Sequence, residues 1–478
     1  MPNPSVPPGQ PRTVTVVGGG LAGISAACAL ADAGYRVQLL ERRPYLGGRA
    51  SSYEHPGTGE VIDNCQHVLI GRCTALIDLY RRLDSQDAIR WYDRFTFLTP
   101  GSPTQPAEET VIQPSFLPAP LHSSLAFLGA PAFSLPDKLA IARGLSSFLR
   151  GLPLDTDEDF LHWLHRHGQT RRAIDRFWKP VLVSALNEDL NRLSVHYAAK
   201  VFRESFLLSP QAGRMGIPAI PLSELYGRAM DYLRARGSEV CLRTSVDAIR
   251  PSDNGWLVTA ADRSFPSDAV VLALSFEATA TLISSLPHNA AAEELSAHLA
   301  QFEHSPITGI HLWLDREITT LDHAVLLDTT IQWLFNKSRL QPGHRGAEAS
   351  YLELVVSASK SLVSMQRQEI IDLAMRELTL FFPALTTVNL LKAAVVKEVR
   401  ATYSIRPGLD RIRPSSASPW PEIFLAGDWT ATGWPATMEG AARSGYLAAE
   451  ALTRSFGAPA SFMVPELPPS GLMGVFFS

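Results

Sequence analysis

The feature that most constrains the fold is a glycine-rich turn between a strand pattern and a helix pattern near the start of the chain. Residues 13–17 are all β-branched and lead directly into Gly18-Gly19-Gly20-Leu21-Ala22-Gly23. An alanine-rich stretch follows, Gly34 provides a stop, and residues 35–40 resemble a second strand. This βαβ order, with strands apolar on both faces, predicts an α/β fold built on a parallel sheet.

The glycine spacing points to a dinucleotide. Gly18 permits a tight turn, Gly20 lets the backbone approach a diphosphate, and Gly23 lets the helix pack closely on the strand. The helix N-terminus adds N–H donors and a partial positive charge. Glu41 ends the second strand 21 residues after Gly20, where its carboxylate can accept the ribose hydroxyls. That carboxylate disfavours a cofactor with a 2′-phosphate.

Two further segments indicate a cofactor longer than a nicotinamide dinucleotide. Gly47-Gly48-Arg49 follows Glu41 closely and can approach the same diphosphate. Near the other end of the chain, residues 423–426 predict a strand that runs into Gly427-Asp428, and residues 435–441 begin a helix. The N-terminus of that helix is suited to the pyrimidine edge of a flavin. We therefore expect three separated segments to meet on one elongated cofactor.

These motifs resemble the FAD-dependent amine oxidase and phytoene desaturase superfamily over about residues 13 to 453. The resemblance implies an α/β Rossmann-like FAD-binding domain with an interleaved mixed α+β substrate domain. It also implies FAD, which we expect to be bound noncovalently because no cysteine or histidine stands at an obvious attachment point. The FAD contacts carried over by resemblance are Gly18, Gly20, Ala22, Gly23, Glu41, Arg42, Gly48, Arg49, Gly427, Asp428 and Met438, with the backbone of Val246 beside the adenine.

Changes of composition along the chain suggest the domain boundaries. Residues 101–214 are rich in proline, aromatics and helix patterns, whereas α/β character returns after 215. We assign residues 12–100, 215–285 and 400–455 to the FAD-binding domain, and 101–214 and 286–399 to the substrate domain. Residues 1–11 read as a disordered lead-in, not a signal peptide, and 456–478 as an apolar C-terminal tail.

Three internal segments are similar to a narrower branch, the hydroxysqualene dehydroxylases. They are Asp63 to Gly71, Phe177 to Pro180 with Ala185 to Asn187, and Thr330 to Lys337. The resemblance implies reduction of hydroxysqualene to squalene in bacterial hopanoid synthesis. Asp63 and His67 are then candidates to assist departure of the hydroxyl, and His67 is slightly favoured because its ordinary pKa lies nearer neutrality. An equal alternative is that His67 orders a loop through hydrogen bonds and that Asp63 caps a turn.

Two other functions stay open at this stage. One is a carotenoid-type or phytoene-type desaturase that oxidises a polyene lipid on the same fold. The other is a nonenzymatic prenyl-lipid binder, because Rab GDP-dissociation inhibitors share this fold without using flavin. Arg49, Asp428 and the helix at Met438 favour a flavoprotein. Trp333 and Phe335 fit either the core of a sheet or the wall of a polyene tunnel.

Composition narrows the partners. Lys and Arg total 43 against 47 Asp and Glu, so no basic excess favours a nucleic-acid partner. No apolar run reaches the roughly 18 residues of a spanning helix, and the proline-interrupted tail fits either the membrane interface or packing on the protein. The four cysteines are too irregularly spaced for a disulfide framework, which favours the reducing cytoplasm. A peripheral position on the inner face of the membrane is compatible with this.

His162, His165 and His167 are better explained as a solvated helix face than as metal ligands. The sequence does not identify the electron donor.

Overall fold

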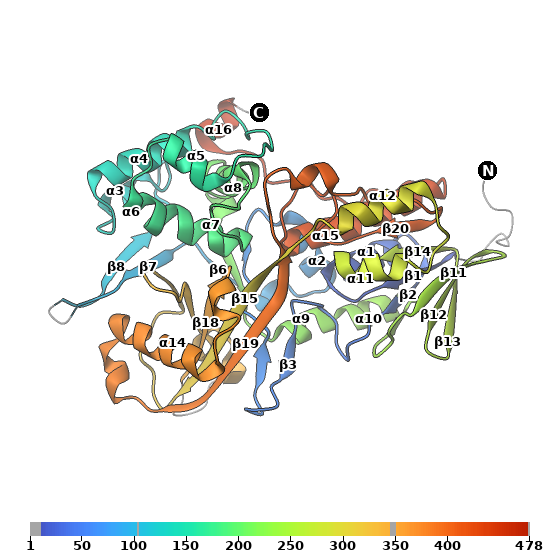
Figure 1. Cartoon of the computed structure of the whole chain (residues 1–478), viewed down its shortest axis with the longest axis horizontal. Helices are drawn as coiled ribbons and strands as arrows, with labels where there is room; N and C mark the ends of the chain where they lie inside the picture. The colour runs from blue at the N-terminus through green and yellow to red at the C-terminus, as the bar shows by residue number, and fades with distance from the viewer. Residues whose placement is uncertain (1–10, 103–104, 345–349, 477–478) are drawn as a thin grey trace.

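The computed structural model describes residues 11–102, 105–344 and 350–476, so the lead-in predicted for residues 1–11 lies almost wholly outside the described residues. Two lobes lie side by side (Figure 1). One holds a parallel sheet with the glycine-rich turn, and the other holds a larger sheet beneath a group of helices. The expected combination of a Rossmann-like domain with a second, mixed α+β domain is confirmed.

The parallel sheet has five strands in the order β10-β2-β1-β14-β20. Its strands come from three distant stretches of the chain and span Thr13–Val17 (β1), Arg36–Leu40 (β2), Glu239–Cys241 (β10), Ala269–Leu272 (β14) and Ile423–Leu425 (β20). Alternate residues face opposite cores: Val14 and Val16 pack with α1 (Leu21–Asp32) and α15 (Met438–Ser455), whereas Val17 packs on the opposite face. There a small sheet, β11 (Ala248–Ser252), β12 (Gly255–Ala260) and β13 (Arg263–Ser267), covers the strands with α11 (Phe276–Ile283) and α12 (Ala290–Leu299).

Helix α1 packs closely on the glycine-rich turn and on α15, and each of these contacts requires a glycine. A side chain at Gly23 would overlap the carbonyl of Gly18, and one at Gly445 would overlap the carbonyl of Ala22. The two helices therefore bring residues near 20 and residues near 440 to the same end of the parallel sheet, where the glycine-rich turn lies.

The second lobe is built on seven strands in the order β19-β15-β18-β17-β16-β7-β8. They are Phe95–Thr99 (β7), Glu108–Ile112 (β8), His304–Leu314 (β15), His323–Leu326 (β16), Trp333–Asn336 (β17), Ser350–Ser357 (β18) and Leu390–Tyr403 (β19). Helix α14 (Arg367–Phe381) packs on one face. Because β7 pairs with β16, residues 95–99 join this sheet and not the dinucleotide sheet, which differs from the boundary drawn at residue 100. Strand β19 likewise runs through the boundary drawn at 399.

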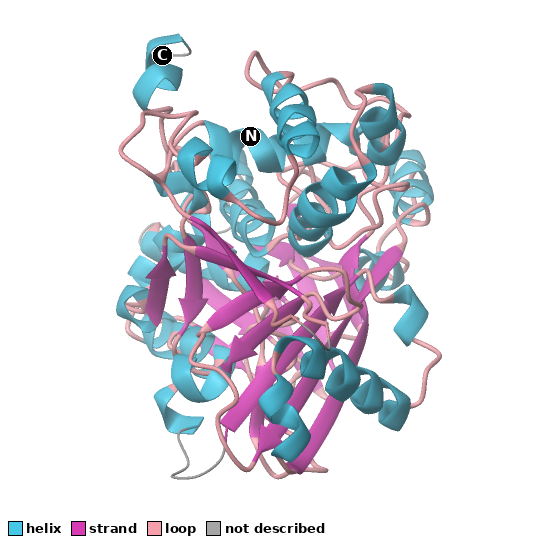
Figure 2. Ribbon diagram, turned by 90° about the vertical axis from the view of Figure 1, so that its left-hand side faces the viewer, coloured by secondary structure: helices cyan, strands magenta, loops and turns pink. Residues whose placement is uncertain are grey.

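Helices lie above this sheet (Figure 2). They are α3 (Ser124–Gly129), α4 (Leu135–Ser146), α5 (Phe160–Arg166), α6 (Arg171–Ala173), α7 (Lys179–Leu186) and α8 (Val195–Phe202), with π-helical turns η2 (Ile174–Trp178) and η3 (Arg203–Leu207). Buried Trp178, Trp163 and Phe160 form the aromatic centre of this group. Two short consecutive helices, α9 (Leu222–Gly227) and α10 (Ala229–Arg234), follow later in the chain.

Shorter elements connect the lobes. Strands β3 (Ser52–Glu54) and β4 (Val61–Asp63) pair with each other, and β5 (Leu69–Ile70), β9 (Met215–Pro218) and β6 (Ile89–Tyr92) form a third small sheet. The remaining helices are α2 (Thr74–Arg82), α13 (Lys337–Leu340) and α16 (Gly471–Phe476). The 3₁₀ turns are η1 (Gln86–Ala88), η4 (Gln211–Gly213), η5 (Pro342–His344), η6 (Lys360–Leu362), η7 (Pro383–Thr387) and η8 (Leu409–Ile412).

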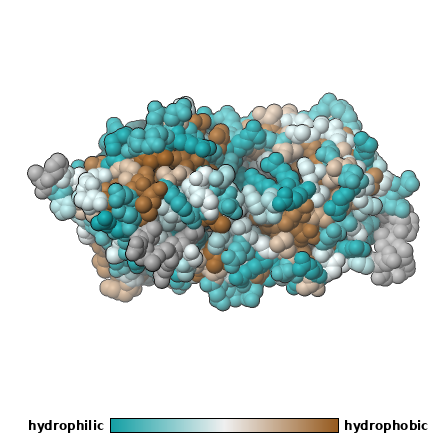
Figure 3. Space-filling model, turned by 90° about the horizontal axis from the view of Figure 1, so that it is seen from below, coloured by the Kyte–Doolittle hydropathy of each residue, from teal (hydrophilic) through white to brown (hydrophobic). Residues whose placement is uncertain are grey.

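The C-terminal tail packs on the protein over its described part. The N–H groups of Phe462 and Met463 donate to Glu450 Oε1 at 2.7 and 2.9 Å, and Met473 is buried. Within the described residues, no helix combines the length and the hydropathy that crossing a bilayer requires. Seen from below, the surface carries apolar areas separated by polar residues (Figure 3).

Candidate active site

The glycine-rich turn leaves the start of α1 open to an anion. Gly18 has φ +105°, and a side chain there would overlap the carbonyl of Ala273. The helix begins after Gly20, which has no side chain with which to cap it, and its first turn contains no acidic residue. The first N–H groups of α1 and the positive end of its dipole are therefore directed at whatever lies beside the turn, with Ala22 in that first turn.

Glu41 lies at the end of β2 directly against the turn. Its Oε2 accepts a hydrogen bond from Gly19 N at 2.7 Å, and its Oε1 accepts one from Arg43 N at 2.7 Å. The backbone of Thr244 donates to the carbonyl of Glu41 at 2.8 Å, which brings the partly buried Val246 segment to the same end. Glu41 and the segment of Val246, both predicted to contact the cofactor, therefore lie at the same end of the sheet.

The second glycine pair lies on the first. Gly47 N donates to Gly19 O at 2.9 Å, and a Cβ at Gly48 would come within 2.9 Å of Gly20 Cα. Of the two neighbouring arginines, Arg42 is exposed, whereas Arg43 Nη1 donates to Gly48 O at 2.7 Å. The structure therefore adds Arg43 to the loop, a residue that the sequence analysis did not single out.

Arg49 joins this loop to the C-terminal motif. Its Nη2 donates to Asp428 Oδ1 at 2.6 Å, and its Nη1 donates to Ala401 O at 2.9 Å. Gly427 N donates to Ser444 Oγ of α15 at 2.8 Å, which fixes the turn before Asp428. The three predicted segments thus meet along one edge of the parallel sheet.

A cavity of about 460 Å³ begins where this edge ends. Its wall includes Thr437 and Met438 at the start of α15 and side chains from α3, α4, α7, α8 and the seven-stranded sheet. Trp333 and Phe335 both line it, with ring centroids 5.4 Å apart and planes 8° from parallel. These two aromatics therefore line the cavity, and Phe335 is at the same time part of a buried hydrophobic cluster, so both alternatives drawn from the sequence remain compatible with the structure.

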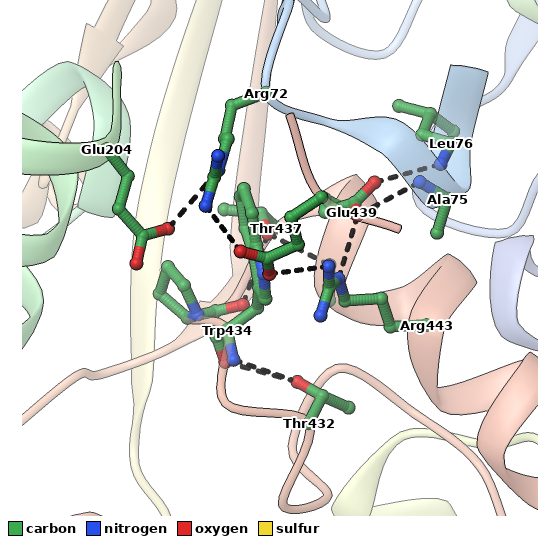
Figure 4. Close-up of polar contacts among 12 residues, drawn as sticks. Arg72, Ala75, Leu76, Glu204, Thr432, Trp434, Thr437, Glu439 and Arg443 are labelled. Carbon is green, nitrogen blue, oxygen red and sulfur yellow. Dashed lines mark hydrogen bonds and ion pairs between the residues drawn. The ribbon is translucent and has the colours of Figure 1, made fainter. Parts of the chain in front are cut away.

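The wall is mainly apolar, and three of its charged side chains, Lys200, Glu204 and Glu439, lie at or beside the start of α15. Figure 4 shows Glu204 and Glu439 with their neighbours. Lys200 Nζ donates to Glu204 Oε1 at 2.7 Å, and Arg72 Nε lies 3.7 Å from Glu204 Oε2. The sequence analysis missed the Lys200–Glu204 pair. Its only sequence signal was a pair of opposite charges four residues apart in a helical stretch.

Glu439 fixes α15 against α2. Its carboxylate accepts hydrogen bonds from the backbone of Ala75 and Leu76 at 3.1 and 2.8 Å and pairs with Arg443 Nε at 2.9 Å (Figure 4). Burial raises the pKa of Glu439, and these contacts partly offset that effect. Arg443 also contacts Glu466 of the tail at 2.7 Å, so the tail closes this side of the site.

Asp63 does not have the properties of the proton donor considered from the sequence. It is buried, its Oδ2 lies 2.7 Å from Lys337 Nζ, and its Oδ1 accepts from Ser52 Oγ at 2.5 Å. Burial acts to raise the pKa of Asp63, but Lys337 and the hydrogen bonds hold it below its ordinary value. It is also absent from the residues that line the cavity. Asp63 is therefore a fixed carboxylate that anchors Lys337, and we correct the earlier assignment.

His67 is held by a hydrogen bond that its ring donates to the backbone. Its Nδ1 donates to Cys65 O at 2.7 Å, which assigns the proton of the neutral ring to that nitrogen. Burial lowers the pKa of His67, so the ring is neutral at neutral pH. Its neighbours Gln66 and Val68 line the cavity, but His67 does not. A role as the acid is therefore disfavoured.

Glu353 is the third ionisable side chain of a buried cluster that it forms with Asp63 and Lys337. Glu353 Oε2 lies 3.4 Å from Lys337 Nζ, and both side chains are almost fully buried. Burial raises the pKa of Glu353 to about 7, because Lys337 only partly compensates for the loss of water. Lys337 also donates to Gln66 Oε1 at 2.9 Å, which ties the cluster to the cavity wall.

The histidine group in the helical lobe has ordinary surroundings. His162 and His165 are exposed, and His167 stacks on Trp163 with ring centroids 3.8 Å apart. Over the described ranges, no group of three His, Cys, Asp or Glu side chains is arranged to hold a metal ion.

Comparison with known families gives one match that covers most of the chain. The model described as flavin containing amine oxidoreductase matches residues 21–453. Among curated proteins, the 15-cis-phytoene desaturase of Glycine max is 28% identical over 468 residues, covering 94% of this chain and 80% of that protein. The probable zeta-carotene desaturase of Synechococcus elongatus is 26% identical over 481 residues, covering 92% and 98%.

Solved structures share the fold at lower identity. An oxidoreductase from Methanosarcina mazei superposes with a TM-score of 0.70 at 17% identity, covering 91% of this chain and 98% of that one. A putrescine oxidase bound to putrescine gives a TM-score of 0.68 at 16% identity, covering 93% and 99%. At these identities the likeness establishes the fold alone.

Proposed function

The chain belongs to the flavin containing amine oxidoreductase family, and from that premise we propose that it reduces hydroxysqualene to squalene. The hydroxyl group would leave as water, and reduced FAD would be the source of the hydride and of the proton. Membership of this family confirms two predictions from the sequence: the cofactor is FAD, and the protein is an FAD-dependent oxidoreductase. This favours an enzyme over the nonenzymatic lipid binder considered at first.

One observation carries the choice of substrate. The three segments that resemble hydroxysqualene dehydroxylases are far apart in sequence, yet each contributes to the wall of the same cavity. They supply Cys65, Gln66, Val68, Leu69 and Ile70; Phe177, Pro180, Ala185 and Leu186; and Trp333 and Phe335. An apolar, aromatic wall suits an isoprenoid chain and keeps water from the reacting carbon.

The residues present fit FAD. The open N-terminus of α1 would hold the diphosphate, Glu41 the ribose, and the start of α15 the pyrimidine edge of the ring. Bound FAD supplies two-electron chemistry. The protein's own contribution is to hold the lipid beside Thr437 and Met438, which stand where the cavity meets the cofactor edge.

A second candidate is oxidative desaturation of a polyene such as phytoene. Its support is the 26–28% identity to phytoene and zeta-carotene desaturases over most of the chain. The two candidates differ in the direction of electron flow and in whether the substrate carries oxygen.

Parallel incubations separate the candidates. Purified holoenzyme is given hydroxysqualene under anaerobic reducing conditions and, separately, phytoene with an oxidant such as a quinone. The proposal requires squalene in the first and no new conjugated double bonds in the second. Desaturated product with no squalene would establish the second candidate instead.

We also propose that the lipid enters through α3 and α4 from a membrane surface. Leu128, Leu135 and Leu139 are exposed by 60%, 65% and 64%, although large apolar side chains are usually buried. The same two helices supply Phe127 and Ile141 to the cavity wall. An apolar outer surface thus lies directly over one side of the cavity.

The charges beside this surface suit an anionic bilayer. Between residues 113 and 152 the basic residues are Lys138, Arg143 and Arg150, and the one acidic residue is Asp137. Asp137 is buried and accepts hydrogen bonds from Ser134 and Thr170. The exposed charge next to the leucines is therefore positive, which attracts anionic headgroups. This surface replaces the C-terminal tail as our proposed membrane contact.

A further inference from the structure

We infer that Lys200 and Glu204 form a subsite that binds the oxygen substituent of the substrate at the cofactor end of the cavity. The inference rests on the proposed function and adds to it, because it commits the substrate to an isoprenoid alcohol and not to a hydrocarbon.

The pair is buried and faces the cavity. Lys200 belongs to the last turn of α8, Glu204 belongs to the π-helical turn η3, and their side chains are 12% and 10% exposed. Both line the cavity, and Lys200 Nζ lies 5.4 Å from the ring centre of Trp434. Trp434 and Thr437 line the same wall just before α15, so the pair lies at the end where the redox chemistry is expected.

The pair has hydrogen-bonding capacity that its neighbours do not use. Glu204 Oε2 accepts no hydrogen bond from the described residues, and Arg72 Nε lies 3.7 Å from it, beyond hydrogen-bond distance. The guanidinium of Arg72 is instead engaged with Glu466 and the carbonyl of Leu467. A buried carboxylate oxygen without a partner is costly, so in natural proteins such an oxygen is paired with a water molecule, an ion or a ligand.

A hydroxyl group matches what the pair offers. The Lys200 ammonium has three N–H donors, of which one reaches Glu204 Oε1, and Glu204 Oε2 is an acceptor. An alcohol oxygen can accept from the first while its proton is donated to the second. A hydrocarbon would leave both groups buried without partners, and sites built for a hydroxyl reject such analogues strongly.

The π-helical turn supports this assignment. A π turn is rare, and it occurs preferentially at functional sites because it widens the helix locally. Here it follows α8 directly and carries Glu204 next to the cavity-lining residues Ser205 and Phe206. A regular α-helix would direct this carboxylate differently.

The test is a binding comparison on oxidised holoenzyme, which lacks the electrons for turnover. Hydroxysqualene and squalene are titrated separately, and the change in flavin absorbance gives each dissociation constant. We expect hydroxysqualene to bind at least about tenfold more tightly than squalene. In the double variant Lys200→Met with Glu204→Gln, we expect that ratio to fall close to one while squalene binding is kept. The control Lys179→Met changes an exposed lysine outside the cavity and should keep the wild-type ratio.

The single variant Glu204→Gln keeps the shape of the side chain and guards against a folding defect. Its flavin content and melting temperature should match the wild type, while the ratio falls several-fold. An unchanged ratio in both variants, or a wild-type ratio near one, would overturn the subsite. That outcome is distinguishable from failure of the proposed function, in which the wild type forms no squalene at all.

Discussion

Arg49 Nη2 donates a hydrogen bond to Asp428 Oδ1 at 2.6 Å, although 379 positions separate the two residues. The arginine belongs to the second glycine loop and the aspartate to the turn before α15. Burial acts to lower the pKa of the Arg49 guanidinium, but the nearby Asp428 carboxylate outweighs that effect, so the pKa of Arg49 is raised. This contact joins the second glycine loop to the C-terminal motif.

Breaking that contact should weaken cofactor binding. In Arg49→Met the loop loses its link to Asp428 and a positive charge beside the diphosphate, so we expect the FAD dissociation constant to rise at least about tenfold. Flavin content after gel filtration and fluorimetric titration measure it. Arg400→Met, which changes an arginine that is 70% exposed, should retain full flavin. If the Arg49→Met variant keeps its full content of FAD, Arg49 has no role in binding the cofactor.

Close packing at the glycines predicts a stability effect. Gly23→Ala places a methyl group into the carbonyl of Gly18, so we expect a loss of about 1–3 kcal/mol in the free energy of unfolding. Chemical denaturation followed by circular dichroism measures the loss. Gly227→Ala is the matched control, since that helical glycine has open space around it. Equal stability of the two variants would contradict the packing described here.

The buried cluster around Lys337 predicts a pH effect. The pKa of Glu353 is about 7 in the folded chain against 4.5 for an ordinary glutamate, so the folded state keeps a proton that the unfolded state releases. Stability contributed by this group is therefore present below about pH 4.5 and lost as the pH rises to about 7. Glu353→Gln removes the dependence, so the variant should gain stability relative to the wild type between pH 5 and pH 8.

Denaturation curves at the two pH values test this prediction. Asp63 and Lys337 face the same carboxylate but stay charged over this range, because their pKa values are shifted away from it. A constant difference between Glu353→Gln and the wild type would show that Glu353 does not titrate there.

The proposed membrane surface predicts lipid-dependent flotation. Replacing Leu135 and Leu139 with serine removes two exposed leucines next to the cavity, so we expect most binding to vesicles of phosphatidylglycerol to be lost. Neutral phosphatidylcholine vesicles should bind the wild type more weakly. Leu391→Ser, on β19 and 55% exposed, is the control. Unchanged flotation of the double variant would eliminate this surface.

Much of the cofactor site could be predicted from the sequence because its signals are local. The glycine spacing, Glu41 and the turn at Asp428 each lie within a few residues of the element that presents them. The sheet boundary was misplaced because β7 joins its sheet by pairing with β16, more than 200 residues later. Pairing between strands so far apart in the chain has no local sequence signal.

The charged groups near the cavity were missed for a related reason. Asp63 and Lys337 are 274 residues apart, and the ion pair between them becomes evident only when the structure shows both side chains buried together. Asp63 was therefore considered as an acid when its partner fixes it as a carboxylate. Lys200 and Glu204 have the spacing of an ordinary ion pair on a helix surface, and only the three-dimensional structure shows that both line the cavity.

The central claim is reduction of an isoprenoid alcohol by this flavoprotein, and a single-turnover experiment tests it most directly. Holoenzyme reduced anaerobically with a known amount of dithionite is mixed with excess hydroxysqualene, and the flavin spectrum and the lipid products are followed together. The account predicts reoxidation of the flavin with about one squalene formed per flavin. Flavin that stays reduced, with no squalene formed, would contradict it.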